Sequence, residues 1–165
     1  MAQGFIKNKT QPTITYGNWS DPIKLYATSS SDAGHDSKSR KLPQSCSISH
    51  LDIVWENVAN SATLLYNLRL TYDEAGNDPV VPGLNNLKPK NGRNHGSADE
   101  NVKFQSIEMG TRYFLSCPST QTEPGAVFLF VYPFIEAGGT ADSDADNTQT
   151  KLRTARLHWR DNDGK

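Results

Sequence analysis

The chain has 165 residues, enough for one domain with a single core, and its formal charge of -1 argues against general electrostatic attachment to DNA or to anionic membranes. Hydrophobic residues make up 35% of the chain and the mean hydropathy is -0.64. Ser, Thr and Asn supply much of the polarity, which favours a thin β-sandwich over a disordered chain. No apolar segment follows a basic start at the N-terminus, and the apolar run 128–135 is too short to span a bilayer as a helix. We therefore expect a protein that is made in the cytoplasm without a secretion signal and has no membrane span.

The N-terminal residues 1–11 are polar around Phe5 and Ile6. We predict an arm that lies on the body of the domain or on a neighbouring molecule, with these two side chains as partner contacts. Residues 12–165 then form a single β-sandwich domain. It begins with two short strands on either side of the turn sequence GNWSDP, and a polar loop at 28–43 follows.

The clearest pattern of the chain runs from Ser49 to Asp73. Residues 64–72 alternate between apolar and polar side chains, the period-two pattern of a strand with one buried face. Residues 51–55 are rich in β-branched and aromatic side chains, and the polar link 56–61 is short enough to fold them back on their partner. This stretch predicts a long antiparallel β-hairpin at the centre of the domain.

The second half of the chain alternates polar stretches with strand patterns. We predict a loop at 74–100, strands at 102–109 and 111–117, and a loop at 138–150. Residues 126–135 are apolar on both faces, as in a strand that is covered on each side, and Pro133 should end its pairing. The last predicted strand, 151–159, alternates again.

Strands with long loops and no helical periodicity predict an all-β fold, an antiparallel β-sandwich or barrel. We prefer a jelly-roll topology to an immunoglobulin-like one. Cys46, Trp55 and Cys117 follow the order of immunoglobulin domains, but Tyr113 does not lie two residues before Cys117, as the tyrosine corner of that fold requires. The two cysteines could pair across a sandwich, but a chain without a signal peptide more often keeps such thiols reduced.

One group of acidic residues is a candidate calcium site. Asp142, Asp144 and Asp146 bring hard oxygen ligands together, but Asn147 and Arg153 stand where an EF-hand loop needs Gly and Glu. The alternatives are a calcium site of another kind and a solvated acidic loop.

Basic residues gather in the predicted loop 74–100, where Lys88, Lys90 and Arg93 precede His95. Such a cluster can contact a partner's phosphates or carboxylates. We regard nucleic acid as possible but do not favour it, because aromatic residues do not alternate with the basic ones in this loop.

Catalytic and cofactor motifs are not found. The histidines His35, His50, His95 and His158 have no metal-ligand spacing with each other or with the cysteines, and no nucleophile or phosphate-binding motif is present. We therefore predict no enzyme and no cofactor.

The three tryptophans suggest a sugar-binding alternative. Trp55 and Trp159 lie in strand patterns and are expected in the core, whereas Trp19 lies in a turn. Its flat ring is a candidate platform on which a sugar could stack.

Taken together, an antiparallel β domain with long loops, an N-terminal arm and no catalytic set resembles the small all-β virion proteins of bacterial or archaeal viruses. These include single jelly-roll capsid subunits, capsid-decorating proteins and tail-tip components. The resemblance extends over residues 13–160. It implies a non-enzymatic subunit of a virion that contacts copies of itself and other structural proteins. The alternatives are a carbohydrate- or receptor-binding module and a calcium-dependent adhesion module.

Overall fold

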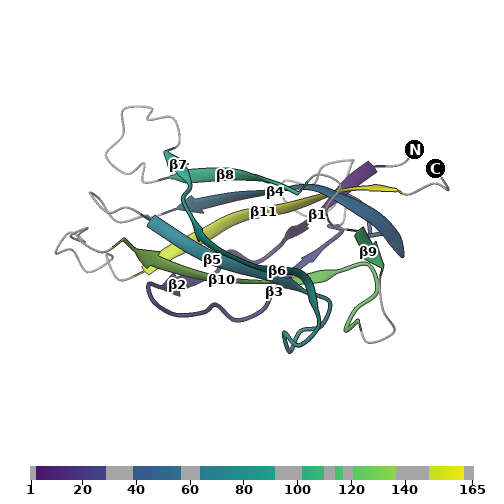
Figure 1. Cartoon of the computed structure of the whole chain (residues 1–165), viewed down its shortest axis with the longest axis horizontal. Coiled ribbons are helices and arrows are strands. Elements are labelled where there is room, and N and C mark those ends of the chain that lie inside the picture. The colour runs from purple at the N-terminus through teal and green to yellow at the C-terminus, as the bar shows by residue number, and fades with distance from the viewer. Residues whose placement is uncertain are drawn as a thin grey trace.

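A computed structural model describes residues 3–28, 39–56, 64–91, 102–109, 114–116, 121–136 and 149–161, with the backbone alone for residues 82, 91 and 114–116. Over these residues the protein is all-β, with 11 strands and no helix (Figure 1). The strands are β1 (Gln3–Asn8), β2 (Thr13–Thr15), β3 (Ile23–Tyr26), β4 (Ser45–Glu56), β5 (Leu64–Thr71), β6 (Pro79–Leu87), β7 (Lys90–Asn91), β8 (Lys103–Glu108), β9 (Phe114–Ser116), β10 (Val127–Ile135) and β11 (Gln149–Asp161). The predicted all-β class is confirmed.

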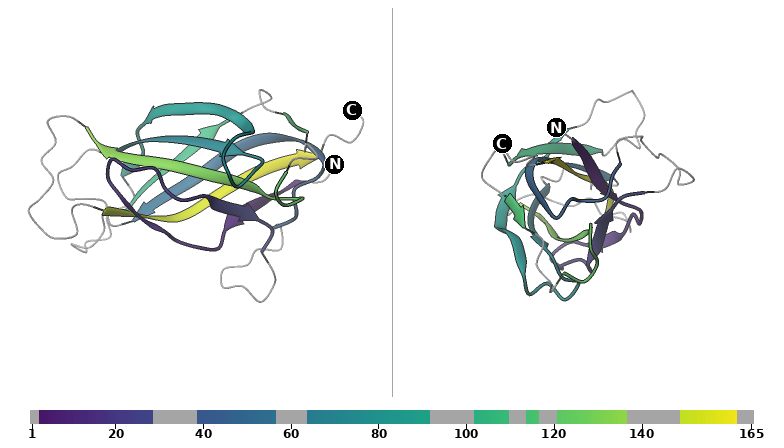
Figure 2. Two further views of the ribbon diagram at one scale, coloured as in Figure 1. Left: turned by 90° about the horizontal axis from the view of Figure 1, so that it is seen from below. Right: turned by 90° about the vertical axis from the view of Figure 1, so that its right-hand side faces the viewer.

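The strands form one antiparallel sheet that curls around a common core (Figure 2). Its order is β6-β5-β10-β3-β1-β11-β4-β8-β7, with β2 paired to β11 and β9 to β4. Curling brings the two ends of the sheet face to face. The Tyr66 hydroxyl on β5 donates a hydrogen bond of 2.7 Å to Gln105 Oε1 on β8, and its ring meets Trp55 of β4 edge-on, with centroids 5.3 Å apart.

Alternate side chains of each strand fill this core. Strand β5 buries Leu64, Tyr66, Leu68 and Leu70, as its sequence pattern predicts. Strand β11 buries Thr150 and Leu152, then Ala155, Leu157 and Trp159. The change of phase in β11 comes from an irregularity of its pairing with β4 between Leu152 and Thr154.

The first half of β10, residues 127–131, is buried on both faces, as predicted, whereas Tyr132, Phe134 and Ile135 in its second half are only partly buried. Strand β10 pairs with β5 and β3, and Val131 belongs to the core, while Phe130 on the opposite face is 6% exposed. Pairing with β5 continues through Pro133 to Ile135, so the prediction that Pro133 ends the pairing is wrong. The Pro133 carbonyl accepts a hydrogen bond from Gly17 N, which means that the proline nitrogen also points to that side, away from β5.

The predicted central hairpin does not form. Strand β4 pairs with β11, β8 and β9, whereas β5 pairs with β10 and β6. Both strands exist, but they meet through their inner side chains across the core instead of through their backbones. The local sequence pattern predicts that a strand forms, but it does not predict which strand it pairs with.

The predicted N-terminal arm is also wrong over the described residues. Residues 3–8 form β1, which lies inside the sheet between β3 and β11. Phe5 and Ile6 are 3% and 0% exposed, so they are core residues of the same chain and not partner contacts. The polar Asn8 can be buried here because its Oδ1 accepts a hydrogen bond from Ala155 N at 2.8 Å.

The predicted loops are only partly described. Within 74–100, residues 79–87 and 90–91 form β6 and β7, so an irregular loop is wrong for this part. Most of 28–43 and of 138–150 lies outside the described residues. Cys46 is fully buried on β4, and Cys117 lies outside the described residues.

Candidate functional site

The structure places the predicted site residues in different surroundings. Trp19 is 46% exposed. Lys88 and Lys90 are exposed around the start of β7. Several predicted site residues lie outside the described residues: Asp142, Asp144, Asp146, Arg93 and His95. Two groups of described residues remain as candidates, an aromatic face around Trp19 and a cluster of His and Asp.

The aromatic face, defined as Trp19, Phe130, Tyr132 and Phe134 with the guanidinium of Arg69, lies on the outer side of β10. The Trp19 and Tyr132 ring centroids are 5.4 Å apart, and those of Tyr132 and Phe134 are 5.9 Å apart. Arg69 Cζ lies 5.0 Å from the Trp19 ring centroid and 4.9 Å from that of Phe130. These contacts make a continuous row of rings across the outside of the sheet.

The loop before β3 holds Trp19 against β10. Gly17 N donates to Pro133 O at 2.8 Å, and Ser20 N donates to Val131 O at the same distance. The Ser20 hydroxyl accepts a further bond from Val131 N at 3.1 Å. Gly17 has φ +85°, a conformation that residues with a side chain rarely adopt. Backbone bonds on both sides therefore fix the position of Trp19.

Arg69 gives the aromatic face a positive charge. Its guanidinium lies near two rings, an arrangement that stabilises by about 0.5–2 kcal/mol according to its exposure. Arg69 Nε is buried and has no hydrogen-bond partner among the described residues. The face thus combines the exposed Trp19 ring and the partly exposed Tyr132 and Phe134 rings with a cation that suits an acceptor or a carboxylate of a partner.

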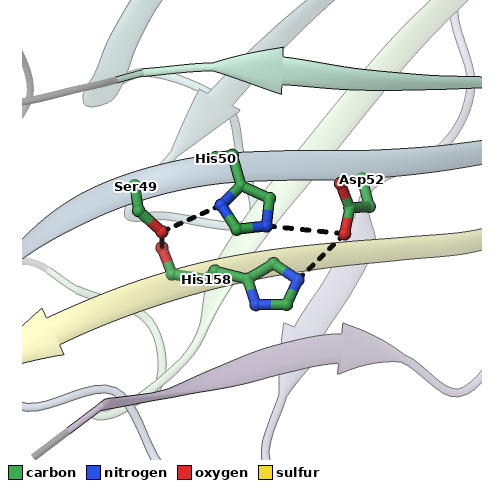
Figure 3. Close-up of polar contacts among 4 residues, drawn as sticks. All are labelled: Ser49, His50, Asp52 and His158. Carbon is green, nitrogen blue, oxygen red and sulfur yellow. Dashed lines mark hydrogen bonds and ion pairs between the residues drawn. The ribbon is translucent and has the colours of Figure 1, made fainter.

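The second group, called here the His–Asp cluster, comprises Ser49, His50 and Asp52 of β4 and His158 of β11 (Figure 3). His50 and His158 lie opposite each other, and their rings stack with centroids 4.0 Å apart and planes inclined by 14°. Asp52 Oδ2 lies 3.0 Å from His158 Nε2 and 3.6 Å from His50 Nε2. Ser49 Oγ lies 3.0 Å from His50 Nδ1 and 3.4 Å from the His158 carbonyl oxygen.

A β-bulge places the cluster on one side of the sheet. The pairing of β4 with β11 shifts between His158 and Trp159, so that Ser49 is an extra residue between Ile48 and His50. In a regular strand, Ser49 and His50 would point to opposite faces. Here both side chains are half-buried while Ile48 and Leu51 stay fully buried. Met109 N donates to the Ser49 carbonyl at 2.9 Å and holds the bulge.

The surroundings favour the neutral form of His158. Burial, with the positive charges of His50 and Arg156 nearby, lowers the pKa of His158, although Asp52 acts in the opposite direction. The side chains of His50 and His158 are 33% and 26% exposed. A hollow of about 310 Å³ lies beside them, lined by Gln3, Phe5, His50, Arg156, His158 and Arg160.

The cluster contains the residue types of a hydrolytic triad, but not its arrangement. His50 Nε2 is too far from Asp52 for a hydrogen bond, and the nearer partner of Asp52 is His158. The Ser49 hydroxyl donates to a main-chain carbonyl. What the arrangement can do is bind a proton or a cation between two imidazoles and one carboxylate.

Comparison with known proteins assigns no family. No family model, curated protein or solved structure matches the chain. Within the described ranges there is also no helix with the length and apolar character needed to cross a membrane.

The sequence alone revealed only part of these sites. Trp19 was found because it lies in a turn. Its neighbours on β10 were expected in the core, because the sequence of that strand is apolar on both faces. The His–Asp cluster was missed because Asp52 and His158 are 106 residues apart in the chain. The available signal was His50-x-Asp52 within a strand, where residues two apart share a face.

Proposed function

We propose that the protein is a non-enzymatic structural subunit of a virus particle, built as a jelly roll, that acts by self-association. The observation that carries this proposal is the nesting of its strand pairs. Without the two- and three-residue strands β2, β7 and β9, eight strands remain. In chain order, the first pairs with the last (β1 with β11) and the second with the seventh (β3 with β10). The third pairs with the sixth (β4 with β8) and the fourth with the fifth (β5 with β6).

Nested pairs of this kind describe a single antiparallel ribbon that has been rolled up, which supports a jelly roll over an immunoglobulin-like sandwich. The ribbon divides into β1-β11-β4-β8 and β3-β10-β5-β6, which follow each other along the sheet. Jelly rolls occur in viral capsid proteins and in lectins. A fold alone does not define a function, so the surface has to separate these classes.

Two surface features support contacts between copies of this chain. Trp19 is 46% exposed at the end of a row of rings, and large exposed rings are typical anchors of interfaces. The formal charge of -1 gives little electrostatic repulsion between copies, and the Arg69 guanidinium can pair with a carboxylate of a neighbouring copy.

The test is the mass of the full chain by sedimentation velocity over a concentration series. We expect reversible growth beyond a dimer, with closed particles or rings in electron micrographs of the concentrated sample. Trp19→Ser should weaken association by about 30-fold, the loss typical of an interface hot spot. Phe104→Ser is the matched control, because Phe104 on β8 is also 46% exposed and lies outside the aromatic face. A strict monomer at every concentration, or equal behaviour of the two variants, would contradict the proposal.

Carbohydrate binding is the second candidate, favoured by the exposed Trp19 ring with Tyr132 tilted at 53° beside it. Trp55 and Trp159 are 0% and 3% exposed, so a sugar that changes tryptophan fluorescence reports on Trp19. Saturable quenching by an oligosaccharide that is lost in Trp19→Ser would support this candidate. Flat titrations across a glycan panel would reject it.

Calcium-dependent adhesion stays a prediction, because Asp142, Asp144 and Asp146 lie outside the described residues. An equal melting temperature with calcium and with chelator would remove it.

A further inference from the structure

The geometry of the His–Asp cluster points to a binding site for one divalent transition-metal ion, with His50 Nε2, Asp52 Oδ2 and His158 Nε2 as its ligands. This inference does not depend on the proposed self-association, because the cluster and the aromatic face share no residue. The three ligand atoms lie within 4.8 Å of one another. Two imidazoles and one carboxylate suit Zn²⁺, Ni²⁺ or Cu²⁺, whereas Ca²⁺ and Mg²⁺ prefer ligand sets of oxygen alone.

The distances are close to those that a bound ion requires. Zinc binds nitrogen and carboxylate oxygen at about 2.0–2.1 Å, so ligands in tetrahedral directions lie about 3.3 Å apart. Asp52 Oδ2 is 3.0 Å from one histidine nitrogen and 3.6 Å from the other. Both distances from Asp52 are therefore within about 0.3 Å of the required separation.

Ser49 favours the tautomer of His50 that metal binding needs, with the proton on Nδ1 and Nε2 free to bind the ion. Its hydroxyl donates to the His158 carbonyl, so its oxygen accepts the proton on His50 Nδ1. Neutral His50 then has its lone pair on Nε2, facing a carboxylate oxygen at 3.6 Å with no hydrogen between them. A cation placed between these two atoms removes their repulsion. Hydrogen bonds of this type orient the ligand rings at metal sites.

Metal binding also requires the two rings to turn. Their planes are inclined by only 14°, so the two Nε2 atoms lie in nearly parallel planes and are not directed at one point. His158 must also release the Nε2 proton that it donates to the Asp52 carboxylate, and the ion takes the place of this proton. Both side chains are partly exposed beside the hollow, which leaves room for rotation about the Cβ–Cγ bond. We therefore expect the ion to unstack the rings. Three protein ligands leave a position open for water.

The experiment is a calorimetric titration of the chelator-treated full chain with Zn²⁺ near neutral pH, with Mg²⁺ and Ca²⁺ as comparison ions. We expect about one Zn²⁺ per chain and no comparable binding of Mg²⁺ or Ca²⁺. Asp52→Asn keeps the shape of the side chain and should weaken Zn²⁺ binding by about tenfold or more, as should His158→Gln. The double variant His35→Gln/His95→Gln is the control, since it removes two histidines elsewhere and should bind as the wild type does.

No saturable Zn²⁺ binding by the wild type would overturn the inference. So would unchanged affinity in Asp52→Asn, or loss of binding in the His35→Gln/His95→Gln control. If a variant of the cluster fails to fold, the imidazole nitrogen resonances of the wild type give the answer. Zn²⁺ should shift Nε2 of His50 and His158 and leave His35 and His95 unchanged, and the reverse pattern would reject the site.

Discussion

The contact between Tyr66 and Gln105 provides a direct test of how the sheet curls. These residues lie on β5 and β8, which are not paired, and their hydrogen bond of 2.7 Å exists only because the two ends of the sheet face each other. In the hairpin predicted from the sequence, Tyr66 would lie beside β4, and nothing would bring it to β8. An energetic coupling between the two side chains therefore reports on the curled arrangement.

The expected magnitude follows from the burial of Tyr66, whose side chain is 0% exposed. Burial raises the pKa of Tyr66, with the nearby Trp55 side chain acting in the opposite direction, so at neutral pH the hydroxyl is protonated and donates to Gln105 Oε1. A neutral hydrogen bond of this kind contributes about 1 kcal/mol to the free energy of unfolding. Tyr66→Phe and Gln105→Ala should each lower the free energy of unfolding. We expect the double variant to lose about 1 kcal/mol less than the sum of the two single losses, and this difference is the coupling energy.

The assay is urea unfolding followed by tryptophan fluorescence, because the Trp55 ring lies 5.3 Å from the Tyr66 ring. The four proteins of the cycle should show equal m values, so that differences in midpoint convert to free energy. Pairing Tyr66→Phe with Gln149→Ala, at an exposed glutamine of β11, is the control and should be additive within about 0.5 kcal/mol. Additivity in the Tyr66 and Gln105 cycle as well would refute the curled arrangement.

Three further predictions follow from burial and pairing. Folding raises the pKa of Tyr66, so its contribution to stability is fully present below the pKa of an unfolded tyrosine, about 10. This contribution is lost as the pH rises above that value. The urea midpoint should therefore fall more steeply above about pH 10 in the wild type than in Tyr66→Phe, and equal slopes would count against it. Deleting residues 3–8 removes β1 from between β3 and β11, so cooperative unfolding in circular dichroism should disappear; a truncated chain that still unfolds cooperatively would show β1 to be dispensable. Leu68→Asp places a carboxylate at a fully buried position and should prevent folding, whereas soluble, cooperatively folded Leu68→Asp protein would contradict the assigned core.

The strands were predictable because their evidence is local. Alternation in residues 64–72 and the apolar run of 126–135 depend only on near neighbours in the chain. Both became strands, with the expected burial in β5 and in the first half of β10. The partners of these strands were not predictable, because any two apolar strand faces are compatible. This is why β4 and β5 were placed in one hairpin. Residues 3–8 were misjudged because Lys7 and Asn8 are polar, although both are buried.

The candidate site was only half predictable for the same reason. An exposed Trp19 follows from its turn, which is a local property. The His–Asp cluster depends on the register of β4 against β11 and on the extra residue Ser49, and both arise from long-range pairing. A change of register by one residue would turn His50 to the other face of the sheet.

The central position of β11 has a consequence for the order of folding. This strand pairs with β1, β4 and β2, and its register joins Gln3 to Arg160. During synthesis, the first strand therefore leaves the ribosome long before the strand that covers one of its edges. Closing a loop of this length carries a large entropic cost before any contact compensates it, so we expect slow folding that is completed only after residues 149–161 have been made. Until then the unpaired edges of β1 and β4 are exposed, and a chaperone that covers them would raise the yield of folded protein.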